Sequence, residues 1–97
     1  MNKEKWSQLT LAQQLGNIGS EISRARHWQE HGDAQNREAS VFRALELIDL
    51  TIEDSRWKNR LKEITRLREV FCNWYLNKSE YQITPRSLEE YCVNFSL

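Results

Sequence analysis

The sequence has no net charge and no long hydrophobic run. Its 14 basic and 14 acidic side chains balance, so the molecule as a whole has no field that would steer it onto nucleic acid or an anionic membrane. The uninterrupted apolar runs are only a few residues long, which is too short to cross a bilayer. Residues 1–6 lack the apolar stretch of a secretory signal. We therefore expect a protein with neither a membrane span nor a secretory leader.

Cysteine is scarce, and the sequence motifs of common cofactor and catalytic sites are missing. Cys72 and Cys92 are the two cysteines, and they lack the paired spacing of a metal site, which suits a reducing cytoplasm. No phosphate-binding loop and no nucleophile elbow occurs. We expect a cytoplasmic protein that binds no cofactor.

Apolar residues instead recur every three or four positions in three long segments. Residues at this spacing share one face of a helix, and that face must be buried against another helix. No segment alternates as a strand would. The sequence predicts an all-α, up-and-down bundle with residues 1–97 as a single domain. The stripes are Leu11, Leu15, Ile18, Ile22, Ala25 and Trp28; Val41, Leu45, Ile48 and Ile52; and Trp57, Leu61, Ile64, Leu67, Phe71 and Trp74.

Capping residues predict where these helices begin and end. The first begins near Ser7, or near Thr10 with a capping box, and runs to about residue 31. There Gly32 is expected to supply the left-handed residue that ends the helix, and Asp33 to cap the next one. The second spans about 34–53 and the third about 56–76. A short fourth helix is expected to begin at Pro85, the only proline, because proline suits the first helical position. The alternative architecture is an open helical hairpin completed by a second copy of the chain.

The second and third helices carry opposite charge. Residues 33–54 contain six acids and two arginines, whereas 55–77 contain six basic residues and two acids. We expect the rims of the two helices to complement each other, and the second helix to be the most buried. The alternative is a basic face for nucleic acid, but its side chains scatter around the helix. They are Lys58, Arg60, Lys62, Arg66 and Arg68.

Small residues line one face of the first helix. Ala12, Gly16, Gly19 and Ser23 follow one another at spacings of four, three and four. Interior glycines cost a helix roughly 1 kcal/mol each relative to alanine, so a compensating contact is expected. The pattern predicts a groove against which another helix packs closely, within the fold or from a second subunit.

Neither of two possible metal-ligand sets predicts a metal site. His27 and His31 lie one turn apart, but no further ligand follows from the local spacing, and histidines in a last helical turn are typical of capping. Glu46, Asp49 and Glu53 form an acidic stripe without the Glu-x-x-His pairs of di-iron bundles. A solvated or charge-paired face explains the stripe.

Arg26 and His31, separated by four residues, give the one catalytic alternative. The segment looks like the short motif of the HEPN (higher eukaryotes and prokaryotes nucleotide-binding) helical-bundle ribonucleases. That resemblance implies that Arg26 and His31 would act on a scissile phosphate of RNA. The match covers six residues, and in that family the motif normally lies later in the bundle than the first long helix.

Aromatic residues are abundant for so small a chain, which has four tryptophans. We expect Trp6, Trp57, Trp74, Tyr75 and Tyr81 to exceed what one small core can hold. Surplus apolar surface usually marks an interface. The favoured function is therefore a non-catalytic interaction module that docks a partner protein or a second copy, with an RNA-binding or RNA-cleaving bundle as the alternative.

Three stretches resemble a group of small prokaryotic helical proteins of unassigned activity. They are LGNIGSEI at 15–22, RALELIDLTI at 43–52 and RLKEI at 60–64, and the resemblance spans roughly residues 9–76. It implies an intracellular bacterial or archaeal domain, and it brings no site residues.

Overall fold

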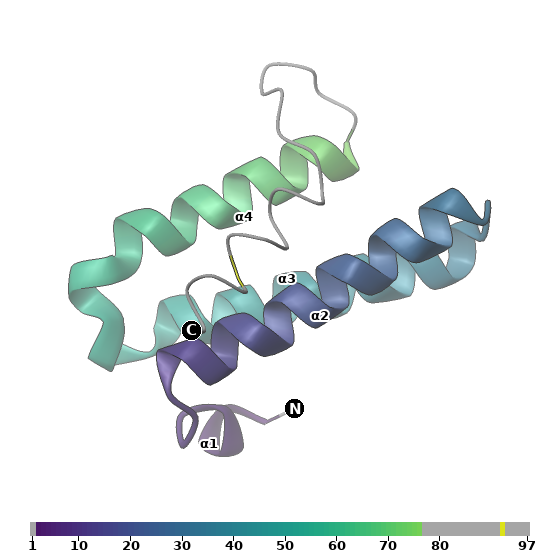
Figure 1. Ribbon diagram of the computed structural model, residues 1–97. Helices are drawn as coiled ribbons and strands as arrows, with labels where there is room; N and C mark the ends of the chain where they lie inside the picture. Colours follow the sequence, from purple (N-terminus) through teal and green to yellow (C-terminus); the bar gives the residue numbers. More distant parts are fainter. Residues whose placement is uncertain (1, 77–91, 93–97) are drawn as a thin grey trace.

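The computed structural model describes residues 2–76 and Cys92, and within this part the chain is helical, without strands (Figure 1). This confirms the all-helical prediction for the described residues. The helix expected from Pro85 lies outside them, apart from Cys92, so the number of long helices and the up-and-down topology stay predictions. The elements are α1 (Lys3–Trp6), α2 (Leu11–Glu30), α3 (Ala34–Glu53), the 3-10 helix η1 (Ser55–Arg60) and α4 (Leu61–Tyr75).

Helix α2 begins and ends at local signals. The Thr10 hydroxyl accepts from the backbone N–H of Gln13, and the Gln13 side chain accepts from the backbone N–H of Thr10, which completes a capping box. After the C-cap at His31, Gly32 takes φ 69°, the left-handed conformation that ends many helices. Asp33 then accepts from the backbone N–H of Asn36 and begins α3. The turn between α2 and α3 is thus built as the sequence predicts.

The chain between α3 and α4 differs from the prediction of one helix over 56–76. Asp54 caps this segment through the backbone N–H of Arg56, but Trp57 has non-helical angles of φ −105° and ψ 23°. The residues after Asp54 consequently form η1, and α4 starts only at Leu61. The interruption accompanies a hydrogen bond from the Trp57 indole to Gln14 of α2, which is described below.

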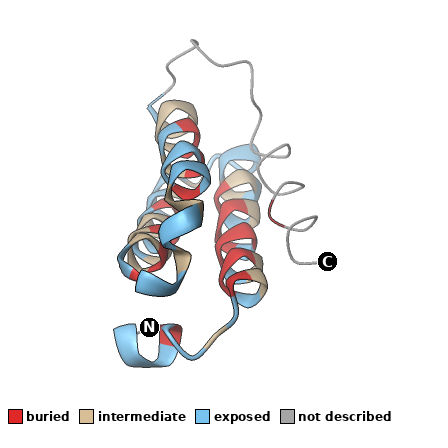
Figure 2. Cartoon of the chain, turned by 90° about the vertical axis from the view of Figure 1, so that its left-hand side faces the viewer, coloured by how far each residue is buried: buried red, intermediate tan, exposed pale blue. Residues whose placement is uncertain are grey.

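Helices α2 and α3 form an antiparallel hairpin, and α4 runs back along α3 (Figure 1). Buried residues follow one side of each helix (Figure 2). The expectation that the second long helix is the most buried is wrong: α2 buries eight residues and α3 five. The buried apolar side chains of α2, α3 and α4 are Leu11, Leu15, Ile18, Ile22 and Ala25; Val41, Ala44 and Ile48; and Ile64, Leu67, Val70 and Phe71.

Helix α1 is a single turn that the periodicity did not predict. Asn2 caps it by accepting from the backbone N–H of Lys5. Its one buried residue is Trp6, whose side chain is only 1% exposed and belongs to the core. Trp6 is therefore the residue that inserts this turn into the core. None of the described helices is long and apolar enough to cross a membrane.

Candidate functional site

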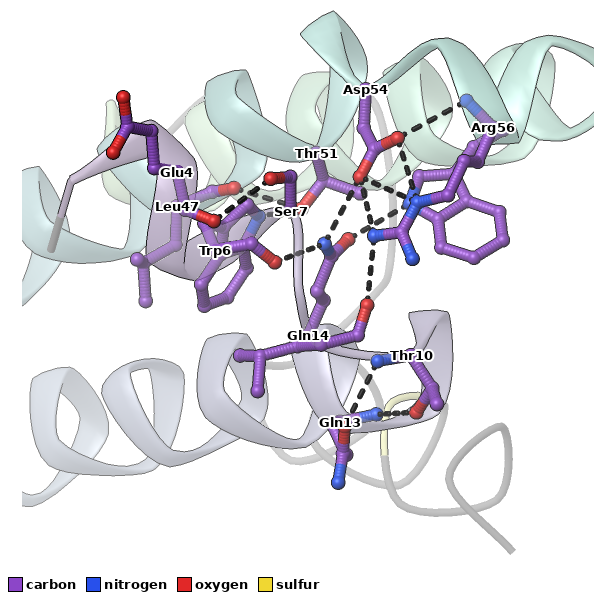
Figure 3. Close-up of polar contacts among 12 residues, drawn as sticks. Glu4, Trp6, Ser7, Thr10, Gln13, Gln14, Leu47, Thr51, Asp54 and Arg56 are labelled. Carbon is purple, nitrogen blue, oxygen red and sulfur yellow. Dashed lines mark hydrogen bonds and ion pairs between the residues drawn. The ribbon is translucent and has the colours of Figure 1, made fainter.

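A buried polar cluster joins α1, α2, α3 and η1 (Figure 3). At its centre the amide nitrogen of Gln14 donates to the carbonyl oxygen of Trp6 at 2.9 Å and to Asp54 Oδ2 at 3.3 Å. The amide oxygen of Gln14 accepts from the Trp57 indole at 3.0 Å. The Trp6 indole donates to Thr51 Oγ1, also at 3.0 Å. One glutamine therefore positions two tryptophans that are far apart in the sequence.

Asp54 and Arg56 form the charged end of this cluster. Arg56 holds the Asp54 carboxylate by an ion pair of 2.7 Å and also donates to the Leu9 carbonyl oxygen at 2.8 Å. The hydrogen bond from the Arg56 side chain is the largest of the effects that lower the pKa of Asp54 to about 2, while burial opposes them. The same bond raises the pKa of Arg56. The Arg56 guanidinium also lies 4.5 Å from the centre of the Trp57 ring.

The polar groups of the cluster are bonded to one another. Among the described residues, every buried side-chain nitrogen or oxygen has a hydrogen-bond partner. The described part of the chain also brings no three histidine, cysteine or acidic side chains together as a metal site. The cluster fixes α1 and η1 against the α2–α3 hairpin.

The structure does not bring Arg26 and His31 together on a shared partner. Arg26 lies 3.4 Å from the Glu30 carboxylate, whereas His31 Nδ1 donates to the His27 carbonyl oxygen at 2.8 Å. A hollow beside the α2–α3 turn is lined by residues of both helices, and neither Arg26 nor His31 lines it. The observed His31 bond is the helix-end contact that capping predicts. The RNA-cleaving alternative stays a sequence prediction and gains no support from these contacts.

Gly19 lies in a tight contact with the C-terminal part of the chain. It is buried, and a Cβ atom added there would lie 2.9 Å from the Cβ of Cys92, which is closer than real side chains approach. Cys92 is itself fully buried. The other members of the small-residue face, Ala12, Gly16 and Ser23, are partly buried. The close-packing hypothesis for this face is tested by a substitution proposed below.

The three tryptophans predicted to be surplus have different surroundings. Trp6 is buried in the core, as described. Trp57 is half-buried between Gln14 and Arg56. Trp74 is also half-buried, with its ring stacked on that of Phe71 at a centroid distance of 5.6 Å. Much of the surface of these three tryptophans is therefore covered by other residues of the chain.

The exposed apolar surface lies elsewhere, where α3 meets the end of α4. Phe42 of α3 is 58% exposed, and its ring meets that of Tyr75 edge-on at a centroid distance of 6.3 Å. Leu76, which follows Tyr75, is also 58% exposed. The remaining large hydrophobic side chains of the described chain are more buried. We call Phe42, Tyr75 and Leu76 the Phe42 patch.

Arg37 orders the α4 side of this patch. Its guanidinium lies 4.9 Å from the centre of the Tyr75 ring and 5.2 Å from that of Trp74. It also donates to the Gln29 side chain at 2.9 Å and to the Tyr75 carbonyl oxygen at 3.3 Å. One arginine thus links α2, α3 and the last turn of α4, so the exposed Phe42 ring stands beside an ordered support.

The charged rims of α3 and α4 meet at one described ion pair. Arg68 donates to Asp49 at 2.7 Å, and this bond raises the pKa of Arg68. Glu38 and Glu46 are exposed, and within the described residues neither forms an ion pair. The opposite charges of α3 and α4 are therefore paired only in part, and Glu38 and Glu46 of α3 face water.

The sequence analysis does not predict the exposed Phe42, because this residue lies outside the apolar stripe of its helix. The signal was present: Phe42 lies beside the stripe at Val41 and Leu45, and it has Glu38 and Glu46 one turn before and after it. A large apolar residue between two acids at a spacing of four faces water with them. Gln14 had no such signal, because its side chain bonds to side chains that lie 40 and 43 residues away.

Comparisons with protein-family models, with curated proteins and with solved structures found no match to this chain.

Proposed function

We propose that this chain is a non-catalytic protein–protein interaction module of the cytoplasm, which docks a partner protein through the Phe42 patch. The supporting observation is that Phe42 and Leu76 are each 58% exposed beside the ordered Tyr75 ring. Contiguous apolar side chains on a small domain usually mark an interface, and aromatic residues are enriched at interface centres. The helices act as a scaffold for this surface, and we expect the short fourth helix predicted from Pro85 to close one end of the bundle.

Support also comes from the small contribution that Phe42 makes to the folded core. Phe42 lies outside the buried core, whereas its neighbours Val41 and Ala44 are fully buried. An exposed phenylalanine adds little to folding, since most of its surface stays in water. A partner that covers it would gain that burial. The polar cluster around Gln14 holds α1 and η1 in place and takes no part in docking.

The test uses a photo-crosslinking amino acid in place of Phe42, in the cells from which the protein comes. We expect one protein species to be captured from position 42. The same amino acid in place of Thr65, on the exposed side of α4, is the matched control and should capture nothing specific. The captured species is identified by mass spectrometry.

A second variant shows whether the apolar surface itself is responsible. With the crosslinker at position 76, Phe42→Ser should abolish capture without changing the melting temperature. Absence of capture from both positions 42 and 76 would refute the proposal. Equal capture from position 65 would refute it as well.

A further inference from the structure

We propose that the partner presents a basic amphipathic helix, whose apolar face covers Phe42 and whose lysine or arginine residues pair with Glu38 and Glu46. This inference rests on the proposed function and adds the chemistry of the partner to it. Three observations support it: two acidic side chains flank Phe42, these acids have no ion partner within the described residues, and neither residues 77–97 nor a second copy carries a matching basic surface.

The first step is the position of the two acids. Glu38 and Glu46 lie four residues before and after Phe42 on α3, and all three side chains are exposed. Positions four apart on a helix are neighbours on one face. The Phe42 ring is therefore flanked along α3 by a carboxylate on either side.

The second step is that other acidic side chains of α2 and α3 are already paired with arginines, whereas Glu38 and Glu46 are not. Asp49 is paired with Arg68, and Glu21 of α2 with Arg24 and Arg43. Within the described residues, no basic side chain pairs with Glu38 or Glu46. Arg37, the nearest cation on the same helix turn as Glu38, is directed to Gln29 and Tyr75 instead.

The third step excludes two occupants on charge. Residues 77–97 of the chain itself contain three acids and two basic residues, which does not complement an acidic flank. A second copy is a poor match as well: its own Phe42 patch carries the same two glutamates, and on the exposed side of its α4 Lys62 and Arg66 alternate with Glu63 and Glu69 without an exposed apolar residue. Neither combines an apolar face with basic flanks. A helix with apolar residues at spacings of three and four, bordered by lysine or arginine, has both features.

The experiment uses two fluorescent model peptides of the same length with the same leucine face. One carries lysine at the flanking positions and the other carries glutamate. Binding to the full chain is followed by fluorescence anisotropy at low ionic strength. We expect the lysine peptide to bind at least about tenfold more tightly than the glutamate peptide, and added salt to reduce the difference.

Charge reversal on the protein gives the decisive comparison. Glu38→Lys/Glu46→Lys should reverse the preference between the peptides, and Phe42→Ser should weaken both. Glu4→Lys/Glu63→Lys makes the same change in net charge away from the patch and should preserve the lysine preference. Circular dichroism checks that each variant is folded.

Three results would overturn the inference: equal binding of the two peptides, an unchanged preference after reversal at positions 38 and 46, or capture of a second copy of this chain from position 42. In each case, capture from position 42 in cells decides separately whether the patch is a docking surface. A failed charge preference with successful capture removes only the basic helix.

Discussion

At the scale of single residues, buried polar side chains contribute to the stability of this fold through hydrogen bonds between distant parts of the chain. Thr51 shows this most clearly, since its hydroxyl accepts from the Trp6 indole and donates to the Leu47 carbonyl oxygen at 2.9 Å. Both partners lie in or beside the core. The loss of one oxygen atom would therefore leave a buried indole N–H without an acceptor.

Thr51→Val makes this change with almost no change in shape. We expect the free energy of unfolding to fall by about 1–3 kcal/mol, because an unsatisfied buried donor costs its full desolvation. Chemical denaturation measures the difference. Trp6→Phe removes the donor, so Thr51→Val should cost much less in that background; an equal cost in both backgrounds would show that the indole bond is unimportant.

Gly19 is the second residue whose replacement gives a signed prediction. Gly19→Leu places a side chain where even a Cβ would lie 2.9 Å from the Cβ of Cys92. Overpacking costs about 1–3 kcal/mol, which exceeds the roughly 1 kcal/mol that a better helix former contributes. We expect the melting temperature to fall. Asn17→Leu, at an exposed position of the same helix, is the control and should change the melting temperature little. A rise in melting temperature for Gly19→Leu would contradict close packing.

At the scale of helices, the ends are decided by short-range contacts and the breaks by long-range ones. The capping box at Thr10 and the Asp33 cap involve residues three apart. The interruption at Trp57 instead accompanies an indole bond to Gln14, 43 residues away. Helix α1 likewise depends on Trp6 reaching α3.

Gly32 offers the test at this scale. Its φ of 69° suits glycine, and a Cβ there would meet no atom within 4 Å. Gly32→Ala should therefore destabilise the protein through backbone strain alone, by about 1 kcal/mol, or about 4–8 °C in melting temperature for a chain of this size. Asparagine, which tolerates this conformation better, should cost less. An unchanged melting temperature for alanine would show that the turn adjusts freely.

At the scale of the whole molecule, Asp54 and Arg56 hold together parts of the chain that the helices alone do not join. The carboxylate is bound by Gln14 of α2, and Arg56 reaches the Leu9 carbonyl before α2. Because the pKa of Asp54 is lowered to about 2 in the folded protein, against about 3.9 in an unfolded chain, the ionised form stabilises the fold.

This linkage predicts a loss of stability in acid. The contribution is present above pH 4 and declines as the pH falls from about 4 towards 2, by an amount on the order of 1–2 kcal/mol. Asp54→Asn should be less stable at neutral pH and should show a shallower loss over this range. Urea unfolding at several pH values measures both slopes. Parallel slopes would indicate that other carboxylates, such as Asp33, whose pKa is also lowered, account for the acid response.

The sequence by itself determined the helical class of the described residues, the turn from α2 to α3 with its left-handed Gly32, and the end of α3, because these depend on periodicity and on side chains within a few residues. It left the start of α2 open between Ser7 and Thr10, and in the structure Ser7 instead ends α1. Tertiary structure decided which large side chains are covered. Trp6 and Gln14 are buried and Phe42 is exposed, although Trp6 and Gln14 carry polar groups and the phenylalanine ring has none. The physical reason is that a side chain is buried only where another helix packs against its face. Adjacent residues on a helix point to different faces, so Val41 is covered while Phe42, the next residue, is exposed.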